Sequence, residues 1–578
     1  MVATAAPAVA AAPPKRQFVP QALDVADWSK IEPVGKKLLD RQINSVTDLE
    51  KWLLDVSELS AVIDEYGSRR YIDKSCHTED KAIEQRFLHY VENIEPKFKT
   101  LTFELQKKYL ASPHRSQLTD ARYRILDRQW QADVDIFREE NVPLETDVTK
   151  LVTDYDKVCG AMIVSFRGKD YTMQQMARFT EEPDRTTRQE AWEASTRRRL
   201  QDRAKIEDLF DKILPLRERI ARNAGFVNYR EYTWKALKRF DYTPDDCIRF
   251  ADSIEKTVVP LVNELDRQRA SDLKLERLRP WDLSVDPKNR PPLRPFNDAD
   301  IDGFVNKTWS IFNKLSPQLA ADFDVLRQRR NLDLGSRKGK QPGGYQSTLN
   351  EVREPFIFMN AAGLQRDVET LLHEGGHAFH ALAAKDEPLV FLRHAPMEFC
   401  EVASMAMELF GSEHLDEFYD EADANRAKRV HFEGIIRFFP WMATIDAFQH
   451  WLYTHQGHSR PERTRAWLGL MERFGSKLDW SGYEPAREAW WQRQLHLFHV
   501  PFYYVEYGIA QLGALQLWMK AKEDPQRALA GYRAGLKLGG TRALPELFQA
   551  AGIHFDFSER TLRPLMDAVA EELRQLPS

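Results

Sequence analysis

The stretch Leu371-Leu372-His373-Glu374-Gly375-Gly376-His377 decides how this sequence is interpreted. On an α-helix, residues four apart lie on one face, so the imidazoles of His373 and His377 can point at a common site. Glu374 directly follows the first histidine and can reach a water molecule held there. His-Glu-x-x-His is the arrangement of a metal site with its general base in zinc peptidases. The flanking residues that fit a helix are Asp367 and Glu369 in its first turn and Val368, Leu371, Leu372, Phe379 and Leu382 on its apolar side.

A third metal ligand is expected nearby, because a catalytic zinc site has three protein ligands and one open position. The metzincin pattern would place a histidine six residues after the second histidine, but that residue is Ala383, so the pattern is excluded. A second helix is expected over 397–410, and its acidic residues Glu398, Glu401 and Glu408 lie roughly on one stripe. Helix geometry alone does not choose among these three. Apolar neighbours on both sides of Glu401 argue against a fully exposed acidic face.

These two helices resemble the M3 family of zinc oligopeptidases, which includes thimet oligopeptidase and the bacterial oligoendopeptidase F and Pz-peptidase types. The residues that carry the resemblance are 373–380, read as His-Glu-Gly-Gly-His-Ala-Phe-His, and 401–408, read as Glu-Val-Ala-Ser-Met-Ala-Met-Glu. The resemblance implies that one Zn²⁺ per chain is held by His373, His377 and Glu401, with Glu374 as the general base. Glu408 follows Glu401 by two turns, about 10 Å along the same face. We expect it to orient a ligand histidine.

Two short β-type runs, 343–349 and 355–360, precede the expected helix that carries His373 and His377, which we call the metal helix. They resemble the small sheet beside the cleft of the family, whose edge pairs with the substrate backbone by strand addition. An ordinary hairpin is the alternative interpretation of these runs.

A segment rich in histidine and tyrosine, 496–508, is expected to stabilise the reaction intermediate. Peptide hydrolysis develops negative charge on the former carbonyl oxygen, which neutral N–H or O–H donors near the zinc can stabilise. His499 and Tyr503 are rivals for this role within the segment. The donors to which the resemblance maps are His496, Tyr504 and Tyr507. In the expected mechanism the zinc activates a water molecule, and Glu374 takes its proton and delivers it to the leaving amine.

Helical periodicity runs through almost the whole chain of 578 residues, which exceeds the usual size of a single core. A strand signal is present at 161–166, followed by a turn at 167–170. The sequence therefore predicts a mostly α protein, and the resemblance implies a prolate, two-lobed fold with a deep substrate channel. Helices are expected near 80–110, 117–140, 185–222, 244–271, 298–315, 420–455, 485–495 and 508–522. The expected divisions are an Ala/Pro-rich disordered tail at 1–20, an N-terminal helical region at 21–200 and a catalytic region at 201–578.

Composition excludes several other classes of protein. Met1 to Pro14 is not a typical secretory signal, because its basic residues, Lys15 and Arg16, follow the apolar stretch instead of preceding it. The net charge of −5, with both signs intermixed, gives no nucleic-acid footprint, and no apolar run is long enough to span a membrane. Four scattered cysteines indicate a reducing compartment, and we expect a cytoplasmic protein. The cysteines are Cys76, Cys159, Cys247 and Cys400.

Three functional interpretations follow from the sequence. The first is an endopeptidase that cleaves unfolded oligopeptides, because the family's narrow channel excludes folded proteins. The second is an exo-acting relative such as a dipeptidyl carboxypeptidase, which needs a cation for the substrate's terminal carboxylate; Arg353 and Arg393 are the candidates. The third is a catalytically silent binding protein, against which the intact His373, Glu374, His377 and Glu401 set argues. The oligomeric state is not determined by the sequence.

Overall fold

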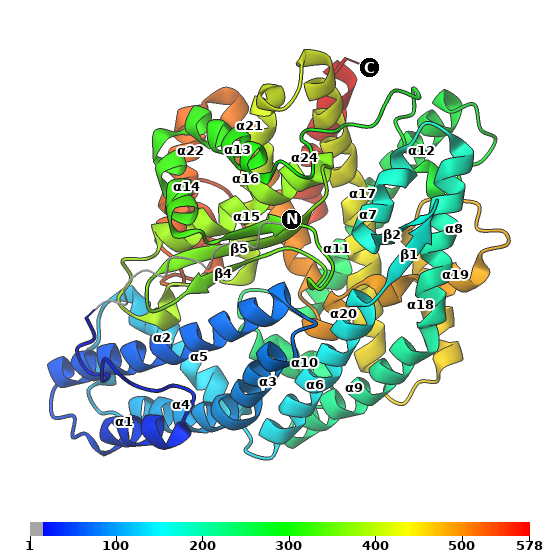
Figure 1. Ribbon diagram of the computed structural model, residues 1–578. Helices are drawn as coiled ribbons and strands as arrows, with labels where there is room; N and C mark the ends of the chain where they lie inside the picture. The colour runs from blue at the N-terminus through cyan, green and yellow to red at the C-terminus, as the bar shows by residue number, and fades with distance from the viewer. Residues whose placement is uncertain (1–14, 578) are drawn as a thin grey trace.

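Helices form most of the computed structural model, which describes residues 15–577 (Figure 1). The expected mostly α fold with a small sheet beside the metal helix is confirmed. Of the expected disordered tail, residues 1–14 lie outside the described residues. In residues 15–20, Arg16 donates to the Glu351 carboxylate at 2.6 Å. No helix within 15–577 is both long enough and apolar enough to cross a membrane.

The N-terminal helices pack around a core of their own, low in the view of Figure 1. Trp52 and Ile63, on the longest of these N-terminal helices, are fully buried there, and Leu389 and Leu392 enter this core from a much later part of the chain. The helices are α1 (Trp28–Asp40), α2 (Val46–Cys76), α3 (Lys81–His89), α4 (Glu95–Leu110) and α5 (Ala121–Ile136). A π-helical turn, Tyr90–Ile94, joins α3 to α4, so that the helix expected over 80–110 is nearly continuous.

The middle of the chain is also helical. Its helices are α6 (Asn141–Gly160), α7 (Met173–Met176), α8 (Arg185–Gln201), α9 (Arg203–Asn223), α10 (Tyr229–Ala236), α11 (Pro244–Thr257), α12 (Val259–Asp272), α13 (Ile301–Leu315) and α14 (Pro317–Arg329). In Figure 1 these helices lie on both sides of the molecule, α8 and α12 on the right and α13 and α14 on the left. The expected strand is confirmed as β1 (Ile163–Phe166), which pairs antiparallel with β2 (Lys169–Thr172). We retain the division between residues 200 and 201 as a proposal; it falls at the junction of α8 and α9.

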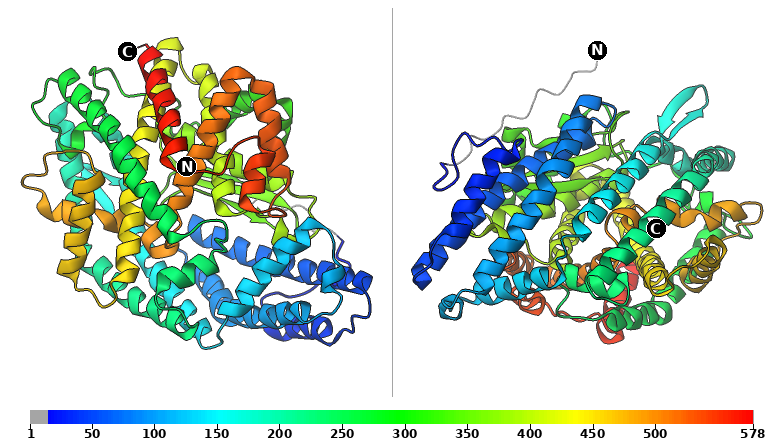
Figure 2. Two further views of the ribbon diagram at one scale, coloured as in Figure 1. Left: turned by 180° about the vertical axis from the view of Figure 1, so that it is seen from behind. Right: turned by 90° about the horizontal axis from the view of Figure 1, so that it is seen from below.

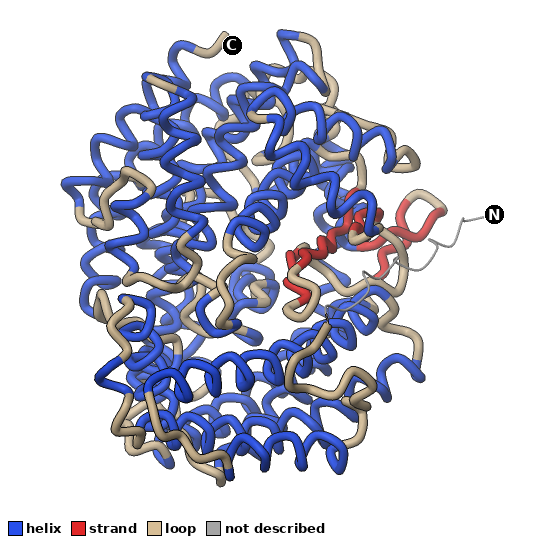
Figure 3. Tube along the Cα trace, turned by 90° about the vertical axis from the view of Figure 1, so that its left-hand side faces the viewer, coloured by secondary structure: helices blue, strands red, loops and turns tan. Residues whose placement is uncertain are grey.

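A second, three-stranded sheet lies beside the metal helix, and Figure 3 shows that strands occupy only a small part of the molecule. The two expected β-type runs are confirmed as β4 (Tyr345–Leu349) and β5 (Glu354–Ala361), which pair antiparallel. A third strand, β3 (Leu332–Gly335), which sequence patterns did not indicate, pairs parallel with β5. The strand order β3-β5-β4 leaves one edge of β4 free of partners among the described residues.

The helices α15 (Gln365–Ala383) and α16 (Met397–Gly411) pack closely against each other. A Cβ atom added to Gly376 would lie 2.5 Å from the carbonyl oxygen of Ala403, so only glycine allows this approach. A Cβ atom on Gly375 would lie 2.7 Å from the ring of Phe312. Gly376 therefore allows α16, and with it Glu401, to lie against the face of α15 that carries both imidazoles, and Gly375 makes room for Phe312 of α13.

The remaining helices enclose this pair, and α24 lies at the end of the molecule away from α1 (Figure 2). They are α17 (Glu421–Thr454), α18 (Arg460–Phe474), α19 (Glu484–Glu488), α20 (His496–His499), α21 (Tyr504–Glu523), α22 (Pro525–Lys537), α23 (Leu544–Ala550) and α24 (Glu559–Gln575). The single helix expected over 485–495 is wrong: α19 ends at Glu488 and a 3-10 turn follows. Tertiary contacts replace helical ones here, since the Tyr155 hydroxyl donates to the carbonyl of Gln492.

Candidate active site

His373 and His377 on α15 and Glu401 on α16 form a compact group of possible metal ligands. Their donor atoms all lie within 4.8 Å of one another. Oε2 of Glu401 is 3.3 Å from Nε2 of His373 and 3.4 Å from Nε2 of His377. Ligand atoms bound tetrahedrally at about 2.0–2.2 Å from zinc lie roughly 3.3–3.6 Å apart, so the donor set fits such an ion. The Glu401 side chain is almost fully buried, with no lysine or arginine within ion-pair distance among residues 15–577.

A second layer of contacts holds these side chains. Nδ1 of His373 lies 2.7 Å from Oε1 of Glu408, which leaves Nε2 of that ring to face the site. The other oxygen of Glu408 lies 3.2 Å from Nε2 of His431. The expected contact of Glu408 is therefore present with His373, whereas sequence patterns gave no signal for His431. Burial alone would raise the pKa of Glu408, but hydrogen bonds with the two histidines lower it to about 2.

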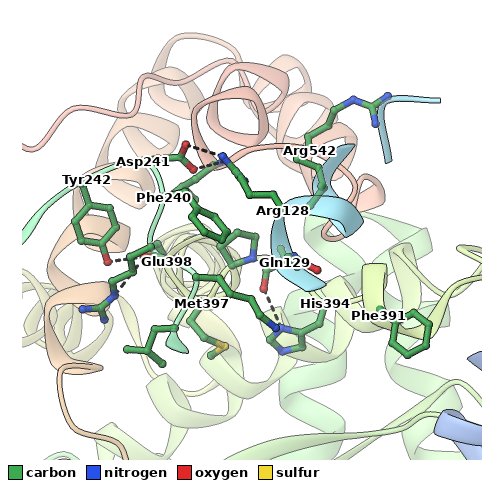
Figure 4. Close-up of a pocket in the computed structure, with 17 residues that line it drawn as sticks. Arg128, Gln129, Phe240, Asp241, Tyr242, Phe391, His394, Met397, Glu398 and Arg542 are labelled. Atoms are coloured by element: carbon green, nitrogen blue, oxygen red, sulfur yellow. Dashed lines mark hydrogen bonds and ion pairs between the residues drawn. The ribbon is translucent and has the colours of Figure 1, made fainter. Parts of the chain in front are cut away.

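The three acidic residues of α16 separate into three environments. Glu401 faces the histidines, and Glu408 lies behind one of them. Glu398 instead points into a different pocket, where its carboxylate accepts a hydrogen bond from the Tyr242 hydroxyl at 2.6 Å (Figure 4). This pocket contains neither metal-site histidine. Of the three acidic residues that helix spacing could not tell apart as a third ligand, only Glu401 therefore lies beside both histidines.

Glu374 points into the site with an unused carboxylate oxygen. Its side chain is buried, and Oε2 has no hydrogen-bond partner among the described residues. Burial raises the pKa of Glu374, and the adjacent His373 and His377 oppose that rise. A Cβ atom added to Gly344, just before β4, would lie 3.5 Å from Oε1 of Glu374. The start of the sheet edge therefore lies beside this carboxylate.

His496 is held in one tautomer by its neighbours. The indole N–H of Trp441 can only donate, and it donates to Oε1 of Gln494 at 3.2 Å, which fixes the orientation of the amide. The amide nitrogen of Gln494 then donates to Nδ1 of His496 at 2.6 Å. The ring proton therefore sits on Nε2, which lies 3.3 Å from the Tyr507 hydroxyl. Burial lowers the pKa of His496 to about 4, so the ring is a neutral donor near pH 7.

The three tyrosines of the segment have different surroundings. Tyr507 and Tyr503 line the same cavity as His496, and the Tyr503 hydroxyl donates to Oε1 of Glu401 at 2.5 Å. Tyr504 does not line that cavity; its hydroxyl lies near Trp441 and Gln494, and its ring packs against that of His496 with centroids 4.9 Å apart. Burial raises the pKa of Tyr507 well above its usual range and that of Tyr504 to about 12, so both remain proton donors at neutral pH. His499, also a cavity residue, lies 2.7 Å from Asp156.

The turn before Tyr503 is clamped from both sides. Phe502 has a φ of 67°, in the left-handed region that a bulky residue rarely adopts. Its N–H donates to Gln449 at 2.5 Å, and its carbonyl accepts from buried Arg239, also at 2.5 Å. Arg239 is in turn paired with Glu506 at 2.6 Å. Strained backbone held in this way is common at functional sites, and here it sets the position of the tyrosines.

A second group with metal-ligating side chains lies between α11 and α17. Cys247, Asp446 and His450 are all buried and have donor atoms within 4.8 Å of one another. None of the three lines the cavity that contains His496 and Tyr507. This group therefore lies outside the site described above.

Comparisons with known proteins agree with this geometry. Residues 178–566 match the model of peptidase family M3, and residues 18–137 match the peptidase M3 N-terminal domain. A solved structure of Pz peptidase A with an inhibitor superposes with a TM-score of 0.91 at 25% identity, over 97% of this chain and 98% of that one. The expected M3-type fold is thereby confirmed.

Curated relatives align over shorter stretches. An oligoendopeptidase F homolog of Borreliella burgdorferi is 25% identical over 38% of this chain, and one of Mycoplasma pneumoniae is 25% identical over 52%. The alignments span 37% and 50% of the length of those relatives. Because the family model covers about two thirds of the sequence in one continuous match, the chain belongs to peptidase family M3.

Proposed function

We propose that this protein is a zinc-dependent endopeptidase that hydrolyses internal bonds of short, unfolded oligopeptides, with one zinc ion per chain. The observation that carries the proposal is the convergence of His373, His377 and Glu401 on one point beside the unpartnered carboxylate oxygen of Glu374. Buried Glu374 has no ion-pair partner in residues 15–577, so its carboxylate remains available for proton transfer. A peptide bond placed at this point would meet a metal on one side and a base on the other.

The ligands would be His373, His377 and Glu401. When bound there, zinc would supply Lewis acidity and lower the pKa of a coordinated water. Glu408 keeps the His373 ring oriented by accepting from Nδ1, and Tyr503 and Ser404 do the same for Glu401 by donating to its two oxygens. Such outer contacts fix ligand geometry and sustain metal affinity.

Glu374 would act first as base and then as acid. Its carboxylate accepts the proton of the attacking water and delivers it to the nitrogen of the leaving fragment. A pKa raised by burial suits this double role, because it brings the carboxylate nearer to neutral pH. Its position next to Gly344 puts it at the edge along which a substrate backbone would lie.

His496 and Tyr507 would stabilise the negative charge that develops on the former carbonyl oxygen. Both are neutral donors at pH 7, and the Trp441–Gln494 chain presents the Nε2 proton of His496 toward the cavity. The resemblance also maps this role onto Tyr504, whose contacts with Trp441 and Gln494 favour an indirect action through His496. Tyr503, the rival, is the tyrosine in contact with Glu401.

The contacts of Arg353 and Arg393 weigh against a role for these two residues in an exo-acting peptidase. Arg353 donates to the carbonyl of Lys385, and Arg393 donates to the carbonyls of Glu387 and Asn350. Both guanidinium groups therefore hold loops together. A cation for a terminal carboxylate has to be sought elsewhere.

Digestion of peptides of graded length, with free and with blocked ends, tests the proposal. The products are mapped by mass before chelation, after chelation and after zinc is restored. We expect internal cuts in end-blocked peptides that disappear with the chelator and return with zinc. Cleavage that strictly requires a free C-terminus would favour the exo-acting relative, and the absence of any chelator-sensitive cleavage would favour a silent binding protein.

A further inference from the structure

Three arginines from distant parts of the chain line the cavity that holds His496 and Tyr507. They are Arg199 on α8, Arg366 in the first turn of α15, and Arg493 at the end of the 3-10 turn Trp490–Arg493. The cavity has a volume of about 670 Å³. We refer to these three residues as the arginine group.

No carboxylate among the described residues is paired with the arginine group. Within residues 15–577, none of its guanidinium groups forms an ion pair or a side-chain hydrogen bond. The two carboxylates that line the same cavity are already engaged. Asp156 is paired with Lys74 at 3.2 Å and lies 2.7 Å from His499. Asp367 accepts from the backbone N–H groups of Ala362 and Leu364 at 2.7 and 2.8 Å.

The arginines also lie close enough to repel one another. Crowding by the surrounding protein, followed by the charges of Arg199 and Arg366, lowers the pKa of Arg493 to about 10, although the side chains of Arg493 and Arg366 remain exposed to the cavity. The group nevertheless stays protonated at neutral pH. Three like charges that line one cavity, with no carboxylate paired to them among the described residues, give it a positive potential that attracts an anion. A guanidinium group forms two parallel hydrogen bonds with a carboxylate, so a carboxylate is the anion that this group is best suited to bind.

The position of the group along the cleft indicates which part of a peptide would reach it. Gly344 and Tyr345, at the start of edge strand β4, line the arginine cavity, whereas Gln346 to Thr348 line a second cavity on the side of His377. A peptide added antiparallel to β4, the commoner mode of pairing, would run toward Gly344 with its C-terminal part. Arg366 precedes His373 by two helical turns, about 10 Å, which corresponds to roughly three extended residues.

We propose that the arginine group binds a carboxylate of the substrate about three residues beyond the cleaved bond, on the side of the leaving amine. This inference rests on the proposed peptidase function. The carboxylate has two possible sources, the free C-terminus of a short peptide or an aspartate or glutamate side chain of a longer one. The enzyme would accordingly prefer substrates that end, or carry an acid, shortly after the cleaved bond.

Binding to the Glu374→Gln variant tests the proposal without turnover. Peptides of one sequence are compared as C-terminal acid and amide, and amidated peptides are compared with glutamate or glutamine at each successive position. Calorimetry or fluorescence anisotropy gives the dissociation constants. A hydrogen-bonded charge pair corresponds to an affinity ratio of roughly 10- to 100-fold, so we expect this preference for the acid or the glutamate form.

Arginine replacements then locate the effect. Arg493→Gln, Arg366→Gln and Arg199→Gln should each reduce the acid-to-amide or Glu-to-Gln ratio, and Arg493→Lys should retain part of it. Arg197→Gln is the matched control, because Arg197 is exposed on the same helix as Arg199 and does not line the cavity. Using ratios removes any general effect of a replacement on folding or binding.

The outcomes separate the two proposals. If the arginine replacements abolish only the acid-to-amide ratio, the ligand is the C-terminal carboxylate. If they abolish only the Glu-to-Gln ratio, the ligand is an acidic side chain. Equal affinities in both comparisons, or ratios that survive all three replacements, would overturn the inference. Absence of chelator-sensitive cleavage by the unaltered enzyme would contradict the proposed function, and the binding ratios would still decide the arginine site.

Discussion

Oε1 of Glu408 lies 2.7 Å from Nδ1 of His373, and this contact leaves Nε2 of the ring free for the site. Glu408→Gln would remove the negative charge behind the imidazole and weaken the fixed tautomer. We expect metal affinity to fall roughly 10- to 100-fold, as measured by competition with a chelator of known affinity. Glu413→Gln, on the exposed surface after α16, is the control and should leave affinity unchanged. Unaltered affinity in Glu408→Gln would mean that the contact does not support the metal.

The tautomer of His496 predicts how the activity of a Gln494 variant depends on pH. In Gln494→Glu, the new carboxylate can only accept, so the ring proton moves to Nδ1 and Nε2 loses its role as donor. We expect kcat to fall by roughly 10²-fold near pH 8. The carboxylate also raises the pKa of His496, and protonation restores an N–H at Nε2. The variant-to-wild-type activity ratio should therefore rise as the pH falls from about 8 to about 6.

Gln117→Glu is the matched control for this change, because the exposed Gln117 contacts Nδ1 of His114 and neither residue lines the cavities beside His373 and His377. Its activity should follow the wild type at every pH. A Gln494→Glu ratio that stays flat with pH would show that the tautomer of His496 does not limit catalysis.

Phenylalanine replacements distinguish the three tyrosines by separate measurements. Tyr507→Phe should lower kcat by roughly 10²- to 10³-fold, the usual loss for a donor to the developing oxyanion, with metal affinity unchanged. Tyr503→Phe should lower metal affinity about 10-fold, because its hydroxyl donates to Glu401. Tyr504→Phe should have the mildest effect on kcat. A loss in Tyr504→Phe as large as that in Tyr507→Phe would instead support the role implied by the resemblance.

Sequence patterns predicted what is local and missed what depends on tertiary contacts. The helix spacing of His373 and His377, and the apolar face around them, are properties of one short segment, so their placement followed from the sequence. The choice among Glu398, Glu401 and Glu408 depends on how α16 packs on α15, which the Gly376 contact with Ala403 determines. Periodicity along one helix contains no information about that contact.

The same limit applies to the tyrosines and to the arginine group. The register of Tyr503 and Tyr504 depends on the left-handed turn at Phe502, which Arg239 and Gln449 hold from more than fifty residues away. The arginine group likewise assembles from three segments whose separation in the chain exceeds a hundred residues. Single residues of this kind give no sequence signal until the fold brings them together.

Arg239 offers a test of stability. It is buried against Glu506 and the Phe502 carbonyl, so Arg239→Leu would leave a buried carboxylate without its partner. We expect a loss of about 3–5 kcal/mol in the free energy of unfolding, seen as a lower denaturant midpoint in circular dichroism. Arg465→Leu, at an exposed position on α18, should shift the midpoint only slightly. Equal midpoints for the two variants would contradict the structural role of Arg239.

Glu374→Gln separates the base from the metal ligands. The replacement preserves shape and leaves His373, His377 and Glu401 in place, so we expect metal content, measured by mass spectrometry, to stay near one zinc per chain. The amide cannot accept the proton of water at neutral pH. We therefore expect kcat to fall by several orders of magnitude; the loss of a general base alone typically accounts for roughly 10²- to 10⁴-fold. His377→Ala should instead lose the metal and the activity together. Substantial turnover by a metal-loaded Glu374→Gln enzyme would assign the base to another residue.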